Sequence, residues 1–259
     1  MRLAVVGKGG AGKSVIAATL ARVLARRGCK VLALDSDTLP GLSISLGAQV
    51  PSEPPLNAAA QRDERKRWRF VPGVGPVRAI QRYATDAPDG VRLLQIGKTG
   101  REGLAPMMGA TNAFYMTIHR LGSAATFRDW VIIGDLPAGP RQTAFGWAPY
   151  AERLLLVVEP TWQSMLTARR IKRIAVAAHP ERAISLVVSK ATGEADAERV
   201  SAFLELSVLA SVPAHDSARS AERAGVALLD HAPGSPAVAA IEQLADRLQA
   251  GIMRLTPRG

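Results

Sequence analysis

Short apolar runs alternate along the chain with longer stretches in which apolar residues recur every three or four positions. The short runs have the length of buried strands, and the longer stretches have the spacing of helices that bury one face. Strands that alternate with helices predict an α/β fold: a mostly parallel, twisted sheet with helices on both faces and right-handed crossovers. The strand-like runs are residues 3–6, 30–34, 91–96, 130–134, 153–159 and 183–189, with a seventh candidate at 208–212.

The length and composition predict one large domain over residues 1–259, because 47% hydrophobic residues are ample for a buried core. Residues 51–90 are rich in Pro, Arg and Gly, and we interpret them as an elaborated surface segment with some helix. No apolar run approaches the ~18 residues of a membrane span, and the first strand leaves no room for a signal peptide. With Cys29 as the only cysteine, we expect a cytoplasmic location.

A glycine-rich segment, G-K-G-G-A-G-K-S at residues 7–14, lies between the first strand and a helical stretch over 15–25. Strand, glycine-rich turn and helix form a phosphate cradle, in which backbone N–H groups and the positive helix end face the anion. Lys13 then neutralises the β- and γ-phosphates, and Ser14 holds Mg²⁺. We expect ATP and not GTP, because no guanine-recognition motif is present. The predicted cradle residues are Gly9, Gly10, Ala11, Gly12, Lys13, Ser14 and Val15.

The second lysine of this segment, Lys8, narrows the class. K-G-G-A-G-K-S is similar to the deviant phosphate loop of the P-loop ATPase family that includes MinD, ParA, the nitrogenase iron protein and the arsenite-pump ATPase. The resemblance implies a homodimer that closes on ATP, in which Lys8 reaches the nucleotide of the partner as an arginine finger does elsewhere. A solvated loop lysine is the alternative, and the rest of the motif disfavours it.

Asp35-Ser36-Asp37 follows the second strand and resembles the second signature of the same family. The resemblance implies that Asp37 lies in switch I and orients the attacking water, while Asp35 supports the Mg²⁺ shell. A carboxylate that caps the next turn is the alternative from the residues alone.

Asp135-Leu-Pro-Ala-Gly139 follows the strand at 130–134 and resembles the Walker B and switch II element. The resemblance implies that Asp135 binds Mg²⁺ through water and that the Gly139 N–H approaches the γ-phosphate. The predicted catalytic residues are therefore Lys8, Lys13 and Asp37, and the predicted metal-site residues are Ser14, Asp35 and Asp135.

The base-recognition residues are harder to place. Ser189 and Lys190 stand where the family often has Asn-Lys, and a serine is a weaker substitute for an amide that donates and accepts at once. Pro213 belongs to V-P-A-H-D at 212–216, which matches the segment of the family near the adenine with one extra residue. We expect Ser189, Lys190 and Pro213 to lie near the base.

The C-terminal half resembles the CooC group, ATPases that assist nickel insertion into carbon monoxide dehydrogenase, through V-V-E-P at 157–160 and L-L-D-H-A-P-G-S-P at 228–236. That group carries a Cys-x-Cys metal site after a Gly-Lys segment. Here residues 97–106 read G-K-T-G-R-E-G-L-A-P, so the soft thiolate ligands are missing. The cysteine ligands of an intersubunit iron–sulfur cluster are missing too. The four histidines show no ligand spacing.

The chain is basic, with a net charge of +11 and an isoelectric point near 10.6. Such a balance favours acidic partners, although the Arg-rich and Ala-rich composition weakens that inference. A basic cluster around Trp68 is predicted to be a solvated face, with contact to an acidic partner or nucleic acid as the alternative. The C-terminal stretch 237–255 has helical spacing and is predicted to pack on the sheet, with membrane contact as the alternative. The cluster comprises Arg62, Arg65, Lys66, Arg67 and Arg69.

These observations together predict an ATP-hydrolysing dimerisation switch of the CooC-like type. Its partners would be a second copy of itself and a client protein, and it would assist maturation or remodelling of a metalloenzyme without a cysteine metal site. The alternative is a ParA/MinD-like positioning ATPase that binds DNA or membrane in its ATP state.

Overall fold

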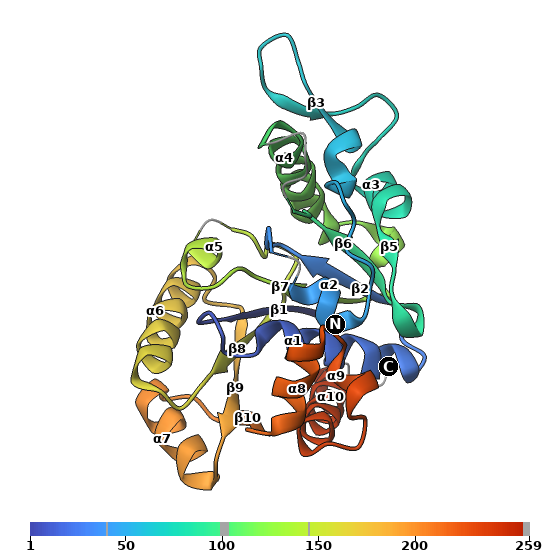
Figure 1. Ribbon diagram of the computed structural model, residues 1–259. Helices are drawn as coiled ribbons and strands as arrows, with labels where there is room; N and C mark the ends of the chain where they lie inside the picture. The colour runs from blue at the N-terminus through green and yellow to red at the C-terminus, as the bar shows by residue number, and fades with distance from the viewer. Residues whose placement is uncertain (40, 99–103, 145, 256–259) are drawn as a thin grey trace.

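The computed structural model describes residues 1–39, 41–98, 104–144 and 146–255, with the backbone alone for Gln142 and 252–255 (Figure 1). Its centre is an eight-stranded sheet in the order β10-β9-β8-β1-β7-β2-β6-β5. Neighbouring strands are parallel except β5, which pairs antiparallel with β6 at one edge. The strands are β1 (Arg2–Gly7), β2 (Val31–Asp35), β5 (Thr85–Asp86), β6 (Arg92–Gln95), β7 (Val131–Asp135), β8 (Arg153–Val158), β9 (Ala183–Ala191) and β10 (Val208–Pro213).

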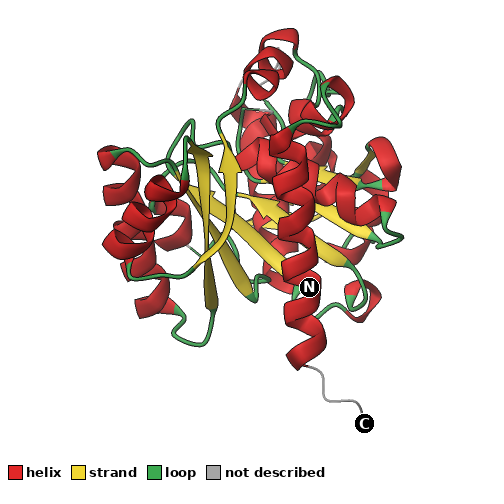
Figure 2. Ribbon diagram, turned by 90° about the horizontal axis from the view of Figure 1, so that it is seen from below, coloured by secondary structure: helices red, strands yellow, loops and turns green. Residues whose placement is uncertain are grey.

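Two helical layers cover the sheet, as Figure 2 shows. Side chains alternate along each strand, so one face packs with the first layer and the other face with the second. The first layer holds α1 (Lys13–Arg26), α2 (Gly41–Leu46), α8 (Asp216–Ala224), α9 (Leu228–His231) and α10 (Pro236–Leu255). The second holds α3 (Pro76–Tyr83), α4 (Leu104–Leu121), α6 (Trp162–Ala178) and α7 (Glu194–Leu204), with the short α5 (Arg141–Ala144) packed against α6. The predicted fold class is confirmed.

The C-terminal helix α10 packs as expected. Helix α10 contacts β10 and α1. It buries four apolar side chains in the core between its layer and the sheet: Val238, Ile241, Leu244 and Leu248. Among the described residues, no helix is both long and apolar enough to cross a membrane.

The segment 51–90 forms a projection over α4, most of it far from α10 in Figure 1. It contains the 3-10 helices η1 (Pro55–Ala59) and η2 (Pro88–Gly90), the antiparallel hairpin of β3 (Ala60–Arg62) and β4 (Trp68–Phe70), and α3. The Arg62 guanidinium lies 5.1 Å from the centroid of Trp68. The helical content was expected, but the hairpin was not. A further 3-10 turn, η3 (Ala125–Phe127), precedes β7.

One buried cation ties the phosphate-loop helix to three distant segments. Arg22 of α1 is 2% exposed, and its guanidinium donates to Asp89 of η2 at 2.5 Å. It also donates to both oxygens of Asp230 of α9, at 2.6 and 2.7 Å, and to the Leu46 carbonyl of α2 at 3.4 Å. The two carboxylates compensate the charge, which satisfies the usual requirement for burying an arginine.

Candidate nucleotide-binding site

The phosphate loop connects β1 to α1 at the carboxyl edge of the sheet. A Cβ on Gly7 would lie 2.3 Å from the Val157 carbonyl oxygen, so only glycine fits where the loop leaves the strand. Gly12 precedes α1 with φ of 81°, in the left-handed region that favours glycine. The first turn of α1 has no side-chain cap and no acidic residue. Its N–H groups and positive end are therefore available to a phosphate.

The two lysines of the loop occupy different environments. Lys13 is 8% exposed, and its Nζ donates to the Lys8 carbonyl at 3.3 Å. Burial lowers the pKa of Lys13, and the carboxylates of Asp135 and Asp37 oppose that shift. The side chain of Lys8 is more exposed, and within the described residues its one hydrogen bond goes from Nζ to the Gly9 carbonyl at 3.4 Å. Only Lys13 is therefore placed among the acidic residues of its own site.

A carboxylate pair adjoins the start of α1. The strand register sets Asp35 of β2 beside Asp135 of β7, and Ser14 Oγ donates to Asp135 Oδ2 at 2.5 Å. Both carboxylates are buried, and within the described structure Asp35 Oδ2 and Asp135 Oδ1 have no hydrogen-bond partner. Burial raises the pKa of Asp135 to about 6. Burial, and then repulsion by Asp135, raises the pKa of Asp35 well above its usual value.

This donor set fits Mg²⁺, which prefers carboxylate and hydroxyl oxygens and compensates such buried charge. Ser14, Asp35 and Asp135 would hold the ion. Mg²⁺ would neutralise negative charge on the phosphates, which the N–H groups of the loop also bind.

Asp37 begins the segment that follows β2. Its N–H donates to Asp35 Oδ1 at 3.2 Å, and its own Oδ1 accepts the Leu39 N–H at 3.1 Å. The second bond is the turn-capping arrangement that the sequence left open as an alternative. The side chain is half-buried, and its expected role in orienting a water stays a prediction.

Gly139 lies next to the phosphate loop, and its expected approach to a γ-phosphate stays a prediction. Its N–H donates to the Gly7 carbonyl at 3.0 Å. A Cβ on Gly9 would lie 3.4 Å from the Cβ of Ala138, which is a van der Waals contact between the two segments. The segment 135–139 therefore touches the loop directly.

Ser189 and Lys190 reach the phosphate loop from β9. Ser189 Oγ donates to the Ala11 carbonyl at 2.8 Å and is buried. Lys190 Nζ donates to the Gly10 carbonyl at 2.6 Å and pairs with Glu159 Oε1 at 2.5 Å. Here both side chains brace the loop, and their expected role in base recognition stays a prediction.

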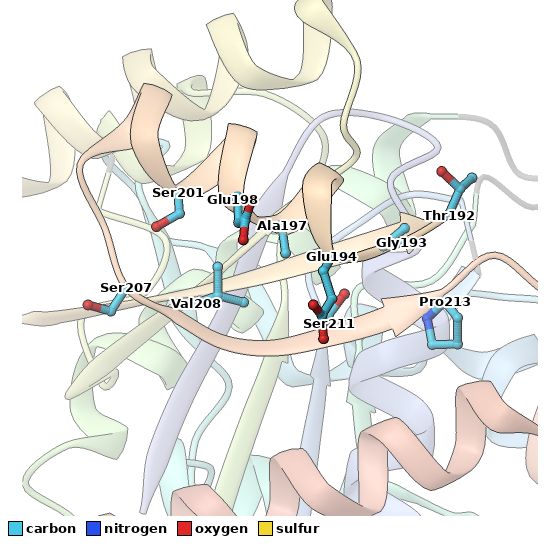
Figure 3. Close-up of a pocket in the computed structure, with 11 residues that line it drawn as sticks. Thr192, Gly193, Glu194, Ala197, Glu198, Ser201, Ser207, Val208, Ser211 and Pro213 are labelled. Carbon is cyan, nitrogen blue, oxygen red and sulfur yellow. The ribbon is translucent and has the colours of Figure 1, made fainter.

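Pro213 lines one end of a pocket of about 770 Å³ between α7 and the strands β9 and β10. Figure 3 shows Thr192, Gly193 and Pro213 at the carboxyl ends of the two strands, with Ser207 and Val208 at the other end of the pocket. Pro213 thus borders an open space at the carboxyl edge of the sheet, and its role in base recognition stays a prediction.

The sequence analysis missed a buried polar contact behind the carboxylates. Ser43 of α2 donates from Oγ to Gln95 Oε1 at 3.0 Å, and its backbone N–H hydrogen-bonds the Asp35 carboxylate. The register places Gln95 of β6 beside Asp35. A glutamine at the end of a strand that neighbours the D-x-D strand, directly after the apolar pair Leu93-Leu94, was the available signal.

The comparisons with known proteins agree with this geometry. The family described as the CobQ/CobB/MinD/ParA nucleotide-binding domain matches residues 3–252. The chain belongs to this family. The CooC accessory protein of carbon monoxide dehydrogenase from Rhodospirillum rubrum is 27% identical over 249 residues, which cover 90% of this chain and 91% of that protein. The chain is therefore a P-loop ATPase of the MinD/ParA type, with a homologue in the CooC group.

Solved structures show the same fold. The cell-division ATPase MinD of Pyrococcus furiosus superposes with a TM-score of 0.71 at 22% identity, covering 96% of this chain and 98% of that one. MinD of Pyrococcus horikoshii OT3, solved with Mg-ADP, has a TM-score of 0.67 at 21% identity, with 97% of each chain covered. Nucleotide and Mg²⁺ thus occur together on this fold.

The Cys-x-Cys metal site of the CooC group has no counterpart in the sequence, which contains one cysteine, Cys29. The stretch that stands in its place, 97–106, includes residues 99–103, which lie outside the described residues.

Proposed function

We propose that the chain is an ATP-dependent dimerisation switch that assists the maturation or remodelling of a metalloenzyme. The observation that carries the dimer is the position of Lys8. Its side chain bonds only the neighbouring Gly9 carbonyl among the described residues, whereas Lys13 lies beside the acidic residues of the site. Because Lys8 does not contact the acidic residues of its own site, its side chain is available to the nucleotide of a second copy.

The chemistry proposed for each residue is positioning and charge stabilisation. The loop N–H groups and Lys13 bind the β- and γ-phosphates, and Ser14, Asp35 and Asp135 would hold Mg²⁺, which would supply further charge neutralisation. Asp37 orients a water for attack on the γ-phosphorus, and the bond to the β–γ bridging oxygen breaks. Lys8 of a second copy stabilises the charge that develops on that oxygen.

Loss of the γ-phosphate gives the switch its output. In this structure the Gly139 N–H donates to the Gly7 carbonyl at 3.0 Å. We propose that ATP takes over this N–H, so that hydrolysis returns the segment 135–139 to the loop and loosens the dimer.

The proposed client is a metalloenzyme, because the CooC protein of R. rubrum, named as an accessory protein of carbon monoxide dehydrogenase, aligns with 90% of this chain. Lacking paired cysteines, the chain would act by contact and not by carrying metal on thiolates.

Molar mass measured by light scattering during size-exclusion chromatography tests the switch. ATP with Mg²⁺ should double the mass, and ADP should not. Co-purification with candidate metalloenzyme subunits, with and without ATP, tests the client. A mass that is the same with ATP and ADP contradicts the switch. ATP-gated dimers that ignore every metalloenzyme offered contradict only the client.

The positioning ATPase remains the second candidate because of the projecting hairpin. Asp63 accepts hydrogen bonds from Arg67 and Arg69, whereas Arg65 and Lys66 at the tip make no ion pair within the described chain. This candidate predicts duplex-DNA binding that rises many-fold with ATP and survives physiological salt. The maturation proposal predicts weak DNA binding that falls steeply with salt and does not depend on the nucleotide.

A further inference from the structure

Helix α6 carries an unusual concentration of positive charge. Arg169, Arg170, Lys172 and Arg173 lie within five consecutive positions, and the helix contains no acidic residue. Helix surfaces in soluble proteins usually mix both signs, because pairs three or four positions apart stabilise the helix. This charge is therefore not explained by the stability of α6 alone.

Neighbouring elements compensate only part of this charge. Lys172 Nζ donates to the Leu204 carbonyl at 2.7 Å and lies 4.0 Å from Glu205 Oε2. The Arg169 guanidinium lies 4.9 Å from the centroid of Phe203. Arg170 and Arg173 are exposed, and neither makes an ion pair or a side-chain hydrogen bond within the described parts of the chain.

The two unpaired arginines border a groove of about 670 Å³. Apolar side chains and the aliphatic parts of the cationic ones form its walls, and Val176 is 49% exposed. A contiguous apolar lining that is open to solvent and rimmed by charged residues is typical of a surface that a partner covers. The lining residues are Pro140, Arg170, Lys172, Arg173, Ile174, Val176 and Ala177.

We propose that this groove is a docking site for an acidic amphipathic helix of a partner protein. Apolar side chains of such a helix would fill the groove, and its carboxylates would pair with Arg170 and Arg173 on the rim. Charge complementarity selects an acidic occupant. The apolar lining selects protein over nucleic acid, since phosphates gain nothing from contact with Ile174, Val176 or Ala177.

The groove also adjoins the nucleotide site through Pro140, which follows Gly139 and lines the groove. This step rests on the proposed function: if ATP draws the Gly139 N–H away from the Gly7 carbonyl, Pro140 moves with it. The affinity of the groove for its partner would then differ between the ATP and ADP states.

The test uses the full-length protein and a fluorescein-labelled synthetic helix, with leucines at i, i+3, i+4 and i+7 and glutamates on the opposite face. Fluorescence anisotropy at ~0.15 M salt gives the affinity. We expect binding that is at least ~10-fold tighter than that of a scrambled peptide or of a peptide with lysine in place of glutamate. Equal binding of the scrambled peptide would overturn the proposal.

Two protein variants locate the binding. Arg170→Glu combined with Arg173→Glu should lower the affinity for the acidic peptide by at least ~10-fold. Arg65→Glu combined with Arg128→Glu makes the same change in net charge at exposed positions elsewhere and should leave the affinity within about twofold. An equal loss in both pairs would mean that net charge alone attracts the peptide, which contradicts a site on α6.

A third variant separates docking from charge. Val176→Ser leaves the charge unchanged. It should still lower the affinity for the peptide about threefold or more, since it removes apolar contact. Retention of full affinity in this variant contradicts an apolar groove. Duplex DNA binding that only the α6 variant loses, without peptide binding, would assign the surface to nucleic acid and overturn the proposal.

Nucleotides distinguish failure of the docking site from failure of the switch. Peptide affinity that is the same with ATP and ADP, but is lost in the α6 variant, supports the groove and contradicts only its coupling to the nucleotide through Pro140. Dimerisation that responds to ATP, without peptide binding to either state, supports the switch and contradicts the groove.

Discussion

Ser14, in the first turn of α1, donates a 2.5 Å hydrogen bond to Asp135 at the end of β7, 121 residues later in the chain. The contact joins the phosphate loop to the Walker B strand without a ligand between them. It uses Asp135 Oδ2, so Oδ1 keeps its capacity to accept. The candidate metal site is therefore partly assembled by the protein itself. Within the described structure, Asp35 Oδ2 and Asp135 Oδ1 are buried without a hydrogen-bond partner, and a cation would compensate them.

The high pKa of Asp135 predicts how stability depends on pH. Burial raises this pKa from 3.8 to about 6, so the folded protein holds the proton more tightly than the unfolded chain. The resulting stabilisation is complete below pH 3.8 and disappears as the pH rises through 6, with a total of about 3 kcal/mol. Without Mg²⁺, protonation of Asp135 should therefore raise the free energy of unfolding as the pH falls from 7 to 5.

Urea denaturation at a series of pH values measures the effect. Asp135→Asn should flatten the dependence relative to the parent chain, which removes contributions that both proteins share. Because Mg²⁺ binds the ionised carboxylate, added Mg²⁺ should stabilise the parent more at pH 7 than at pH 5. Parallel pH curves for the parent and the variant would refute the assignment.

The two loop lysines should fail differently when replaced. Lys13→Ala should abolish nucleotide binding, because the phosphates lose their main cationic partner. Lys8→Ala should bind ATP within a few-fold of the parent but lose ATP-dependent dimerisation and most hydrolysis. Isothermal titration calorimetry and phosphate release separate these outcomes. Hydrolysis by Lys8→Ala at the parental rate would show that this lysine does not act across a dimer.

Replacement of Asp37 should trap the ATP state. Asp37→Asn keeps the size of the side chain and its ability to accept the Leu39 N–H, but it weakens the orientation of water. ATP binding should persist, hydrolysis should fall by ~10²-fold or more, and the dimer should accumulate. Chromatography with ATP and Mg²⁺ follows the dimer. If the variant binds ATP and stays monomeric, Asp37 has the capping role alone.

The contact between Gly134 and Tyr150 predicts a large effect on stability. A Cβ on Gly134 would lie 1.7 Å from Tyr150 Oη and 2.8 Å from Cζ, and the ring is buried. Gly134→Ala should therefore destabilise the fold by about 3 kcal/mol. Tyr150→Phe should change stability by less than ~1 kcal/mol, because its hydroxyl has no hydrogen-bond partner in the described structure.

Thermal denaturation of both single variants and of the double variant completes this test. The double variant should recover part of the loss, since the closest clash is with the hydroxyl. Additive losses in the double variant would place the cost of Gly134→Ala elsewhere.

The purified protein should bind neither Ni²⁺ nor Zn²⁺ tightly at one ion per dimer. Within the described residues, no group of three or more His, Cys, Asp or Glu could hold a metal ion. The histidines are dispersed: the ring of His119 contacts that of Tyr115 in a tilted arrangement, and His215 caps α8. Equilibrium dialysis that finds a stoichiometric submicromolar site would contradict this and direct attention to Cys29 and His119.

The centre of the sheet could be predicted from sequence because β1, β2, β7 and β8 each contain an uninterrupted apolar run, and β1, β2 and β7 lead directly into a motif. Asp35 and Asp135 could be placed together because parallel strands end at one edge. The edge strand β5 was missed because two residues carry no periodicity, and the hairpin was missed because Arg62 and Trp68 are paired by the turn between them.

The least predictable features join side chains across elements. Lys190 was assigned to the base, but here its ammonium binds the Gly10 carbonyl and Glu159. Ser43 and Gln95 drew no attention because each is a common polar residue alone. Only the hydrogen bond that joins α2 to β6, and the register of β6 with β2, place this pair next to Asp35.

The buried guanidinium of Arg22 has a consequence for dissecting the molecule. Asp89 and Asp230 compensate its buried charge. A fragment that ends before α9 lacks Asp230 and would leave Arg22 in the core with one of its two carboxylate partners. The penalty would fall on α1, whose first turn forms the phosphate cradle. We therefore expect that the segment from α9 onward, which contains none of the predicted phosphate-site residues, helps the N-terminal loop to hold its shape.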